Sequence, residues 1–290
     1  MFDEGAARKE IETRLLGAED VGDAMRLKAA ARWNQTEGDW RRLLRLNPGG
    51  CFAATAGGRL LATATTTPYG RELAWVGMVL VDPDFRRRGI ATKLVLEAMA
   101  HLRARGVAAV KLDATPEGAP VYEALGFEAE SRIERWSGEA RERGRAVGGV
   151  GELADISAVF ESDRLAFGAD RSELLRALFE DACVAPLVIV GSGGLVRGYA
   201  IAREGTEAAY VGPLVASDAA TASALLDGVL ARLAGRRVYV DLNTTFEGGA
   251  GELSARGFVR QRELIRMRYG AGGEAGTSGR VFAIAGPEYG

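Results

Sequence analysis

Residues 75–104 read W-V-G-M-V-L-V-D-P-D-F-R-R-R-G-I-A-T-K-L-V-L-E-A-M-A-H-L-R-A, and this stretch decides the fold. The apolar run over residues 76–81 is typical of a buried strand, and Asp82 and Pro83 end it. After three arginines and Gly89, apolar residues recur three and four positions apart, which is the spacing of one helix face. The stretch therefore predicts a strand, a basic turn and a helix, in that order.

The basic turn has the features of a phosphate site. The first N–H groups of a helix lack backbone partners and carry the positive end of the helix dipole. Gly89 lets the backbone approach an anion, and Arg86, Arg87 and Arg88 offer guanidinium groups that match phosphate oxygens. Taken alone, a run of charges is as well explained by a solvated turn. Its place between strand and helix favours a phosphate site.

The pattern Arg86-x-x-Gly89-x-Ala91 resembles the acyl-CoA pyrophosphate loop of the GNAT superfamily of N-acyltransferases. The resemblance continues in the expected order, with a strand predicted over residues 108–113 and a helix over residues 117–125. Gly126 then opens a further strand. Tyr122 stands four residues before Gly126, where that superfamily commonly keeps a tyrosine.

The resemblance implies which residues bind acetyl-CoA. Backbone groups at the end of the predicted strand would pair with the pantetheine arm in the manner of an added strand, and the turn would hold the diphosphate. The residues implied are Val79, Leu80, Val81, Arg86, Arg87, Arg88, Gly89, Ile90, Ala91 and Thr92.

The implied reaction is direct attack by a primary amine of a small-molecule acceptor on the thioester of acetyl-CoA. An alkyl amine with a pKa of about 10 is mostly protonated at neutral pH, so a base or a desolvating pocket must release its proton. Glu72, Asp113, Glu123 and water remain open as bases. Tyr122 is the candidate proton donor to the departing thiolate, although it also fits as a packing residue. A non-catalytic acyl-CoA-binding sensor is the alternative function.

A segment dense in aromatic and amide groups separates the first two predicted helices. Thr36 fits the N-cap of the second helix, and tryptophan packing on the core explains one aromatic residue, but neither explains the amides. In the GNAT superfamily this loop borders the acceptor pocket. The resemblance therefore implies an acceptor pocket lined by Trp33, Asn34 and Gln35, with Asp39 or Trp40 as further candidates.

Composition narrows the range of partners. The chain has 290 residues, 47% of them hydrophobic, and a net charge of −2 from 37 basic and 39 acidic residues. No global field therefore favours nucleic acid or a membrane. Cys51, Cys183 and His101 are too few for a disulfide framework, a metal site or a histidine-based triad. The absence of a long apolar run predicts a cytoplasmic protein, as monomer or homodimer, without a metal.

The chain contains an internal repeat. The stretch V-K-L-D-A-T-P-E-G…E-A-L-G-F in the first half matches V-Y-V-D-L-N-T-T-F-E-G…S-A-R-G-F in the second. We therefore expect an α+β fold of two tandem GNAT-like domains, each a mixed, mostly antiparallel twisted sheet flanked by helices. The predicted domains are residues 1–137 and 150–290, joined by a charged, glycine-rich linker over residues 138–149. Residues 128–136, which alternate, are expected to form the strand that closes the first domain.

The second copy is degenerate. Residues 215–220 replace the arginine turn with V-A-S-D-A-A, in which Asp218 would repel phosphate, and Leu253 stands at the tyrosine position. We expect no CoA binding there. This copy either supports the first domain or closes its acceptor pocket. Residues 163–171 are predicted as a loop whose charges pair with each other or contact substrate, and the apolar residues 281–285 are predicted to pack back on a domain.

Overall fold

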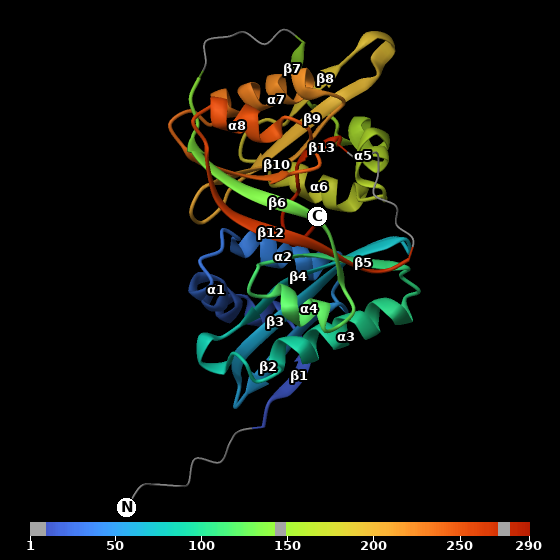
Figure 1. The fold of residues 1–290 in the computed structure, drawn as a ribbon, viewed down its shortest axis with the longest axis vertical. Helices are drawn as coiled ribbons and strands as arrows, with labels where there is room; N and C mark the ends of the chain where they lie inside the picture. Colours follow the sequence, from blue (N-terminus) through green and yellow to red (C-terminus); the bar gives the residue numbers. More distant parts are fainter. Residues whose placement is uncertain (1–9, 143–148, 272–278) are drawn as a thin grey trace, which may run out of the picture.

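The computed structural model describes residues 10–142, 149–271 and 279–290. In the first half the strands are β1 (Glu12–Leu15), β2 (Cys51–Ala56), β3 (Arg59–Tyr69), β4 (Leu73–Val81), β5 (Ala109–Ala114) and β6 (Glu128–Glu139), and the α-helices are α1 (Val21–Ala30), α2 (Glu37–Leu46), α3 (Ile90–Ala104) and α4 (Ala119–Glu123) (Figure 1). The predicted strand, basic turn and helix over residues 75–104 are confirmed as β4, the turn and α3.

The second half repeats this order after the predicted linker. Its strands are β7 (Val150–Glu152), β8 (Leu187–Val190), β9 (Val196–Arg203), β10 (Ala209–Ala216), β11 (Arg237–Asn243), β12 (Val259–Gly270) and β13 (Val281–Ala283), and its α-helices are α5 (Phe160–Phe167), α6 (Ser172–Glu180), α7 (Ala219–Arg232) and α8 (Gly249–Ala255). β6 reaches two residues into the predicted linker, and residues 143–148 of that linker lie outside the described residues.

Local chemistry sets the helix starts that the sequence predicts. The Thr36 hydroxyl accepts the backbone N–H of Asp39 at 3.3 Å, and the Asp39 carboxylate accepts the N–H of Thr36 at 2.8 Å, so a capping box begins α2. Gly89, with a φ of 76°, precedes α3 in the left-handed region that favours glycine. The predicted cap at Thr36 is confirmed.

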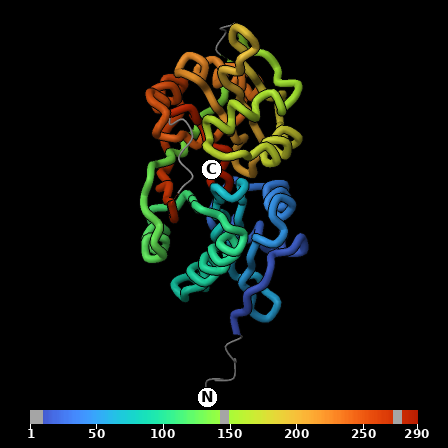
Figure 2. The backbone as a smooth tube through the Cα atoms, turned by 90° about the vertical axis from the view of Figure 1, so that its right-hand side faces the viewer, coloured from blue at the N-terminus to red at the C-terminus, as the bar shows by residue number. Residues whose placement is uncertain are grey.

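The described strands of both halves join in one 13-stranded sheet, in the order β1-β2-β3-β4-β5-β12-β6-β11-β13-β10-β9-β8-β7. α3 and α4 cover one face of the first half, where they enclose a buried apolar cluster with the sheet. α1 and α2 cover the opposite face, and the cluster there continues into α5, α6 and β9 of the second half. The two halves are stacked along the long axis of the molecule (Figure 2).

The two halves exchange strands at the centre of the sheet. β12 of the second half pairs antiparallel with β5, from Ile265 opposite Ala114 to Gly270 opposite Ala109. β6 of the first half lies between β12 and β11 instead. The strand predicted over residues 128–136 is confirmed as β6, but its neighbours in the sheet are β12 and β11. β6 and β12 share almost the same alternation of exposed and buried residues, so either strand satisfies the position beside β5.

The segment after β12 packs into the core, as predicted from its apolar composition. β13 pairs with β10 and β11, and residues 284–290 then lie between the halves, where both views mark residue 290 (Figures 1 and 2). The indole N–H of Trp75 donates to the carbonyl of Pro287 at 3.0 Å, and the Tyr69 hydroxyl donates to the carbonyl of Tyr289 at 2.6 Å. Arg171 donates to the carbonyl of Gly290 at 3.0 Å. The segment thus ties the first half to the second.

The predicted loop over residues 163–171 is mostly helical. α5 extends to Phe167, and Gly168 ends it in the left-handed region. Arg171 and Asp163 form a buried pair of hydrogen bonds, each 2.8 Å, so the prediction that these charges pair with each other is confirmed for them. A loop was expected because the periodic apolar signal is weak across this short helix.

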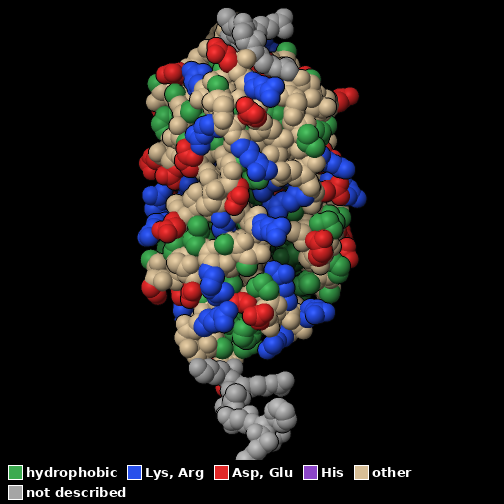
Figure 3. Space-filling model, turned by 90° about the vertical axis from the view of Figure 1, so that its left-hand side faces the viewer, with side chains coloured by type: hydrophobic (Ala, Val, Ile, Leu, Met, Phe, Trp, Pro, Cys, Tyr) green, Lys and Arg blue, Asp and Glu red, His purple; other side chains and the backbone are tan. Residues whose placement is uncertain are grey.

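Charges of both signs alternate over the surface. The face drawn in Figure 3 shows Lys and Arg side chains interspersed with Asp and Glu side chains, with basic groups gathered across the middle. This pattern agrees with a net charge near zero. None of the described helices is long and apolar enough to cross a membrane.

Candidate active site

The arginine turn joins β4 to α3 through a short 3-10 turn, Pro83–Phe85. Asp82 anchors it: its carboxylate accepts hydrogen bonds of 2.7 Å from Arg26 and from Arg59. Burial alone would raise the pKa of Asp82, but the hydrogen bonds from these arginines and from the N–H of Asp84 outweigh burial and lower it. The anchor is therefore ionised at neutral pH and fixes the start of the turn.

The three arginines of the turn are exposed and lie beside the N-terminus of α3. Arg86 donates to the carbonyl of Val81 at 3.3 Å, and Arg88 donates to the carbonyl of Asp84 at 3.0 Å while its guanidinium stacks over the Phe85 ring at 4.9 Å. Long exposed side chains of this kind can turn outward to meet an anion. The turn therefore offers guanidinium groups and helix N–H groups at one place.

β4 and β5 part before they reach the turn. They pair in parallel only from Leu73 opposite Ala109 to Trp75 opposite Lys111, although β4 continues to Val81. On its other edge β4 stays paired with β3, across an irregularity near Met78, which has a φ of 48°. The carbonyl of Met78 accepts the Thr63 hydroxyl at 2.7 Å. The result is a free backbone edge on β4 that runs toward the arginine turn and suits an extended ligand.

Tyr122 lies on α4, on the α3 side of this gap. Its ring packs against the same apolar cluster as Val79, Val81 and Phe85, and makes an edge contact with Phe127 at 6.0 Å between centroids. Burial raises the pKa of its hydroxyl above the usual range, so it stays protonated at neutral pH. Val79, Val81, Ile90 and Tyr122 thus border the cluster on the α3 face, whereas the Leu80 side chain belongs to the cluster on the opposite face.

The residues named for the acceptor lie elsewhere, against the second half. The Asn34 side chain accepts the N–H groups of Glu207 at 2.9 Å and Ala208 at 3.1 Å, and donates to the carbonyl of Ala208 at 3.0 Å. Gln35 donates to the carboxylate of Glu288 at 2.8 Å. Trp33 packs against the cluster that joins the halves. Asn34 and Gln35 are buried and hold the second half and its last segment.

The two further acceptor candidates are also buried. Trp40 is fully enclosed in the core of the first half. Asp39 belongs to the capping box and bonds Arg42 at 2.7 Å, with Arg203 of β9 at 3.9 Å. Burial tends to raise the pKa of Asp39, but these two guanidinium groups lower it overall. Asp39 is thus an ion-pair partner at the contact between the halves.

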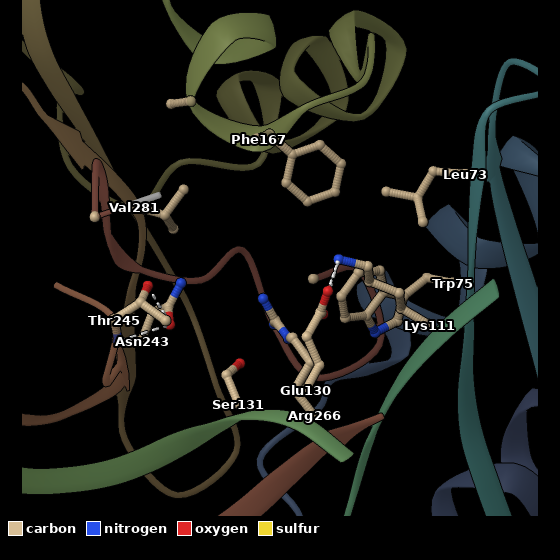
Figure 4. Close-up of a pocket in the computed structure, with 13 residues that line it drawn as sticks. Leu73, Trp75, Lys111, Glu130, Ser131, Phe167, Asn243, Thr245, Arg266 and Val281 are labelled. Atoms are coloured by element: carbon tan, nitrogen blue, oxygen red, sulfur yellow. Dashed lines mark hydrogen bonds and ion pairs between the residues drawn. The ribbon is translucent and has the colours of Figure 1, made fainter. Parts of the chain in front are cut away.

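A cavity of about 130 Å³ opens on the face opposite α3, where β4 and β5 part (Figure 4). Trp75 and Lys111 line it from the first half, and Phe167 lines it from α5 of the second. Glu130 of β6 and Arg266 of β12 form part of its wall. Sequence reasoning did not select Lys111, Glu130 or Arg266, although a lysine in the apolar strand A-V-K-L-D-A was an available signal.

The matching gap in the second half is filled by the chain itself. β10 and β11 pair in parallel from Ala209 opposite Val238 to Val211 opposite Val240 and then part, as β4 and β5 do. β13 enters between them, with Ala283 opposite both Leu214 and Leu242. β13 therefore occupies the place that a pantetheine arm would need in this half.

The turn of the second half is closed as well. The Asp218 carboxylate caps α7 by accepting the N–H of Thr221 at 2.8 Å, and it also accepts the Ser217 hydroxyl at 2.7 Å. These hydrogen bonds lower the pKa of Asp218, so it is ionised at neutral pH. Asp218 takes the N-cap position that Gly89 holds in the first half, and its carboxylate repels a phosphate there. No group of three or more His, Cys, Asp and Glu side chains within residues 10–142, 149–271 and 279–290 could hold a metal ion.

Two family models match the chain, one to each half. The model described as "Acetyltransferase (GNAT) family" matches residues 22–127, and the model described as "Acetyltransferase (GNAT) domain" matches residues 159–283. Together they span most of the chain, which therefore belongs to the GNAT superfamily and carries two GNAT domains in tandem. The chain is therefore an N-acyltransferase. Enzymes of this family use an acyl-CoA donor and an acceptor.

Two relatives match most of the chain. The chain is 28% identical over 264 residues to holothin acyltransferase of Pseudoalteromonas sp. (strain SANK 73390), covering 90% of this chain and 88% of that protein. It is 25% identical over 217 residues to the uncharacterized N-acetyltransferase YitH of Bacillus subtilis (strain 168), covering 73% and 75%.

Solved structures show the same fold. The crystal structure of a candidate acetyltransferase from Pyrococcus horikoshii superposes with a TM-score of 0.84 at 22% identity, covering 100% of this chain and 99% of that one. A tandem GNAT protein from the clavulanic acid biosynthesis pathway superposes with a TM-score of 0.60 at 20% identity, covering 91% and 99%.

Proposed function

We propose that the first half binds acetyl-CoA and transfers its acetyl group to a primary amine of a small-molecule acceptor by direct attack. The observation that carries this proposal is the free edge of β4, which leads from its last pairing with β5, at Trp75, to the arginine turn. Residues 1–137 hold the donor site, residues 138–149 link it to the degenerate half in residues 150–290, and the chain acts in the cytoplasm as a monomer or homodimer.

The donor lies along this edge. The diphosphate meets Arg86, Arg87, Arg88 and the backbone from Gly89 to Thr92, because helix N–H groups and guanidinium groups both favour phosphate. The pantetheine arm pairs with the backbone of residues 79–81, including Leu80, in the manner of an added strand. The thioester then reaches the point where β4 and β5 part.

The chemical step joins the amine nitrogen to the carbonyl carbon and breaks the carbon–sulfur bond. A backbone N–H near Val79 or Val81 stabilises the oxyanion that forms between these events. The thiolate takes a proton from the Tyr122 hydroxyl, and the amine gives up its own proton to water or to a base that we leave unassigned. Trp33, Asn34 and Gln35 were predicted to contact the acceptor, but the two amides hold the second half, and none of the three lines the cavity where β4 and β5 part.

A thiol-release assay with acetyl-CoA and a panel of primary amines tests the proposal. Replacing Arg86 and Arg88 together by Ala should raise the KM for acetyl-CoA by about tenfold or more, since each phosphate contact is a charge-assisted hydrogen bond. Replacing Arg103 and Arg105, at the far end of α3, is the matched control and should leave that KM unchanged. If the chain binds acetyl-CoA tightly but acetylates no amine, a non-catalytic sensor is favoured. If the double variant at Arg86 and Arg88 keeps the wild-type KM for acetyl-CoA, the proposed donor site is wrong.

A further inference from the structure

The cavity between the halves begins where the proposed thioester ends. Trp75 and Lys111 are the last residues that pair β4 with β5, and both line the cavity. Trp75 belongs to the apolar cluster on the face opposite α3, whereas its neighbours Ala74 and Val76 belong to the cluster under α3. A nucleophile in this cavity would therefore approach the thioester from the face opposite Tyr122.

A fixed cation points into the cavity from the exchanged strand β12. Arg266 is held by two hydrogen bonds to Asp113, of 2.8 and 2.9 Å, and its guanidinium stacks on the Trp75 ring at 4.6 Å. An arginine has five N–H donors, so these two bonds leave others for a ligand. Figure 4 shows the Arg266 side chain ending in the hollow, beneath the Phe167 ring.

Polar groups of both charges surround this cation. Glu130 of β6 accepts a hydrogen bond of 2.8 Å from Lys111, and its carboxylate borders the same hollow (Figure 4). Across the hollow, the side-chain oxygen of Asn243 accepts from the backbone N–H of Thr245 at 3.2 Å and from its hydroxyl at 3.0 Å. The oxygen of Asn243 is thereby occupied, and its amide NH2 is suited to donate to a ligand.

We propose that this cavity is the acceptor site and that the acceptor is a small amine that also carries a carboxylate or phosphate group. This inference rests on the proposed function. Arg266 and Asn243 bind the anionic group, and Glu130 receives the amine beside Lys111, where the strands part. Residues from both halves are then needed for one site, which gives the degenerate half a role in choosing the acceptor.

The charges also suit the chemistry of the amine. A nearby cation disfavours the charged form of an ammonium group and so lowers its pKa, which increases the neutral fraction that can attack. Lys111 and Arg266 supply that effect in part, because Glu130 and Asp113 pair with them and offset it, and the Glu130 carboxylate orients the amine by accepting its hydrogen bond.

Matched pairs of amines test the class of acceptor. β-Alanine is compared with β-alaninamide, and aminoethyl phosphate with ethanolamine, so that each pair differs by one anionic group and the two pairs separate carboxylate from phosphate. We expect kcat/KM to be about 10-fold to 100-fold higher for the anionic member of at least one pair. If kcat/KM for both neutral amines equals or exceeds that of their anionic partners, the inference is wrong, but the proposed acetyl transfer still stands.

A double variant tests the residue that binds the anion. Arg266→Gln is combined with Asp113→Asn so that no buried carboxylate is left without its partner. We expect the advantage of the anionic amine in kcat/KM to disappear, chiefly through a rise in its KM, so that the two members of each pair become equal. The control combines Arg260→Gln with Glu134→Gln, which removes another ion pair between β12 and β6, of 3.0 Å, and should keep the advantage. If the Arg266→Gln, Asp113→Asn variant keeps the higher kcat/KM for the anionic amine, Arg266 does not bind the anionic group.

Calorimetry separates this inference from the proposed function. If acetyl-CoA binds but no amine is acetylated, the same amines are titrated into the protein saturated with CoA. Binding of an anionic amine to the wild type and not to the Arg266→Gln, Asp113→Asn variant would support the site, and no binding to the wild type would overturn it. Failure of acetyl-CoA itself to bind would instead defeat the proposed function.

Discussion

At the scale of single residues, the proposed mechanism makes the departure of the thiolate depend on the hydroxyl of Tyr122. Its raised pKa keeps it protonated through neutral and moderately alkaline pH, so it can donate throughout that range. We predict that Tyr122→Phe lowers kcat by about 100-fold, in the range of a lost general acid, with little change in the KM for acetyl-CoA.

The control for Tyr122 lies in the same apolar cluster. Tyr269 packs on Phe127 at 5.5 Å between ring centroids, so Tyr269→Phe removes a hydroxyl from the same surroundings without touching the proposed chemistry. Its kcat should match the wild type in the thiol-release assay. If both variants lose activity equally, packing explains the effect and the acid role of Tyr122 is wrong.

The raised pKa of the buried Glu288 carboxyl group leads to a prediction of how the stability of the fold depends on pH. Burial, and then the nearby Asp39 carboxylate, raise the pKa of Glu288 from its usual value of 4.5 to about 7. Between these values the folded chain keeps a proton that the unfolded chain has lost. The folded state therefore binds more protons, and this residue's contribution to stability falls as pH rises through that window.

The variant Glu288→Gln should remove that loss, because the amide can still accept the hydrogen bond from Gln35 and carries no charge. We predict that its melting temperature exceeds that of the wild type by a few degrees at pH 8, and that the difference shrinks toward pH 5. Thermal unfolding at several pH values measures this. A difference that stays constant or grows toward acid pH would contradict the explanation.

At the scale of elements, the exchange of β6 and β12 makes each half depend on the other. β5 has β12 as its neighbour, and β11 has β6, so a separated half would expose sheet edges. We predict that residues 1–142 produced alone aggregate, whereas co-production with residues 143–290 yields a stable heterodimer. Size-exclusion chromatography distinguishes these outcomes. A soluble, monomeric fragment 1–142 with a native melting transition would contradict the exchange.

The sequence was sufficient to predict the elements with strong local signals. The apolar run before Asp82, the glycine at position 89 and the cap at Thr36 each follow from local chemistry, and all three are found. The strand exchange was not predictable, because β6 and β12 carry nearly the same alternation and differ only in distant pairing. The residues that line the cavity were not predicted either. Arg266 and Lys111 line one cavity only because β12 pairs with β5, which the sequence did not reveal.

At the scale of the whole molecule, the two halves have diverged in one decisive respect. In the first, the gap between β4 and β5 is free beside an arginine turn. In the second, β13 fills the gap between β10 and β11, and Asp218 caps the helix that follows. The degenerate half therefore contributes walls to the shared cavity, and in our proposal the donor binds to the first half.

A calorimetric titration of the intact chain with acetyl-CoA tests this account most directly. The account predicts one molecule bound per chain and loss of binding in Gly89→Val, because valine is strained at a φ of 76° and disturbs the turn. The control Gly106→Val, strained at a φ of 74° beyond the far end of α3, should still bind one molecule. Two molecules per chain, or undiminished binding by Gly89→Val, would contradict it.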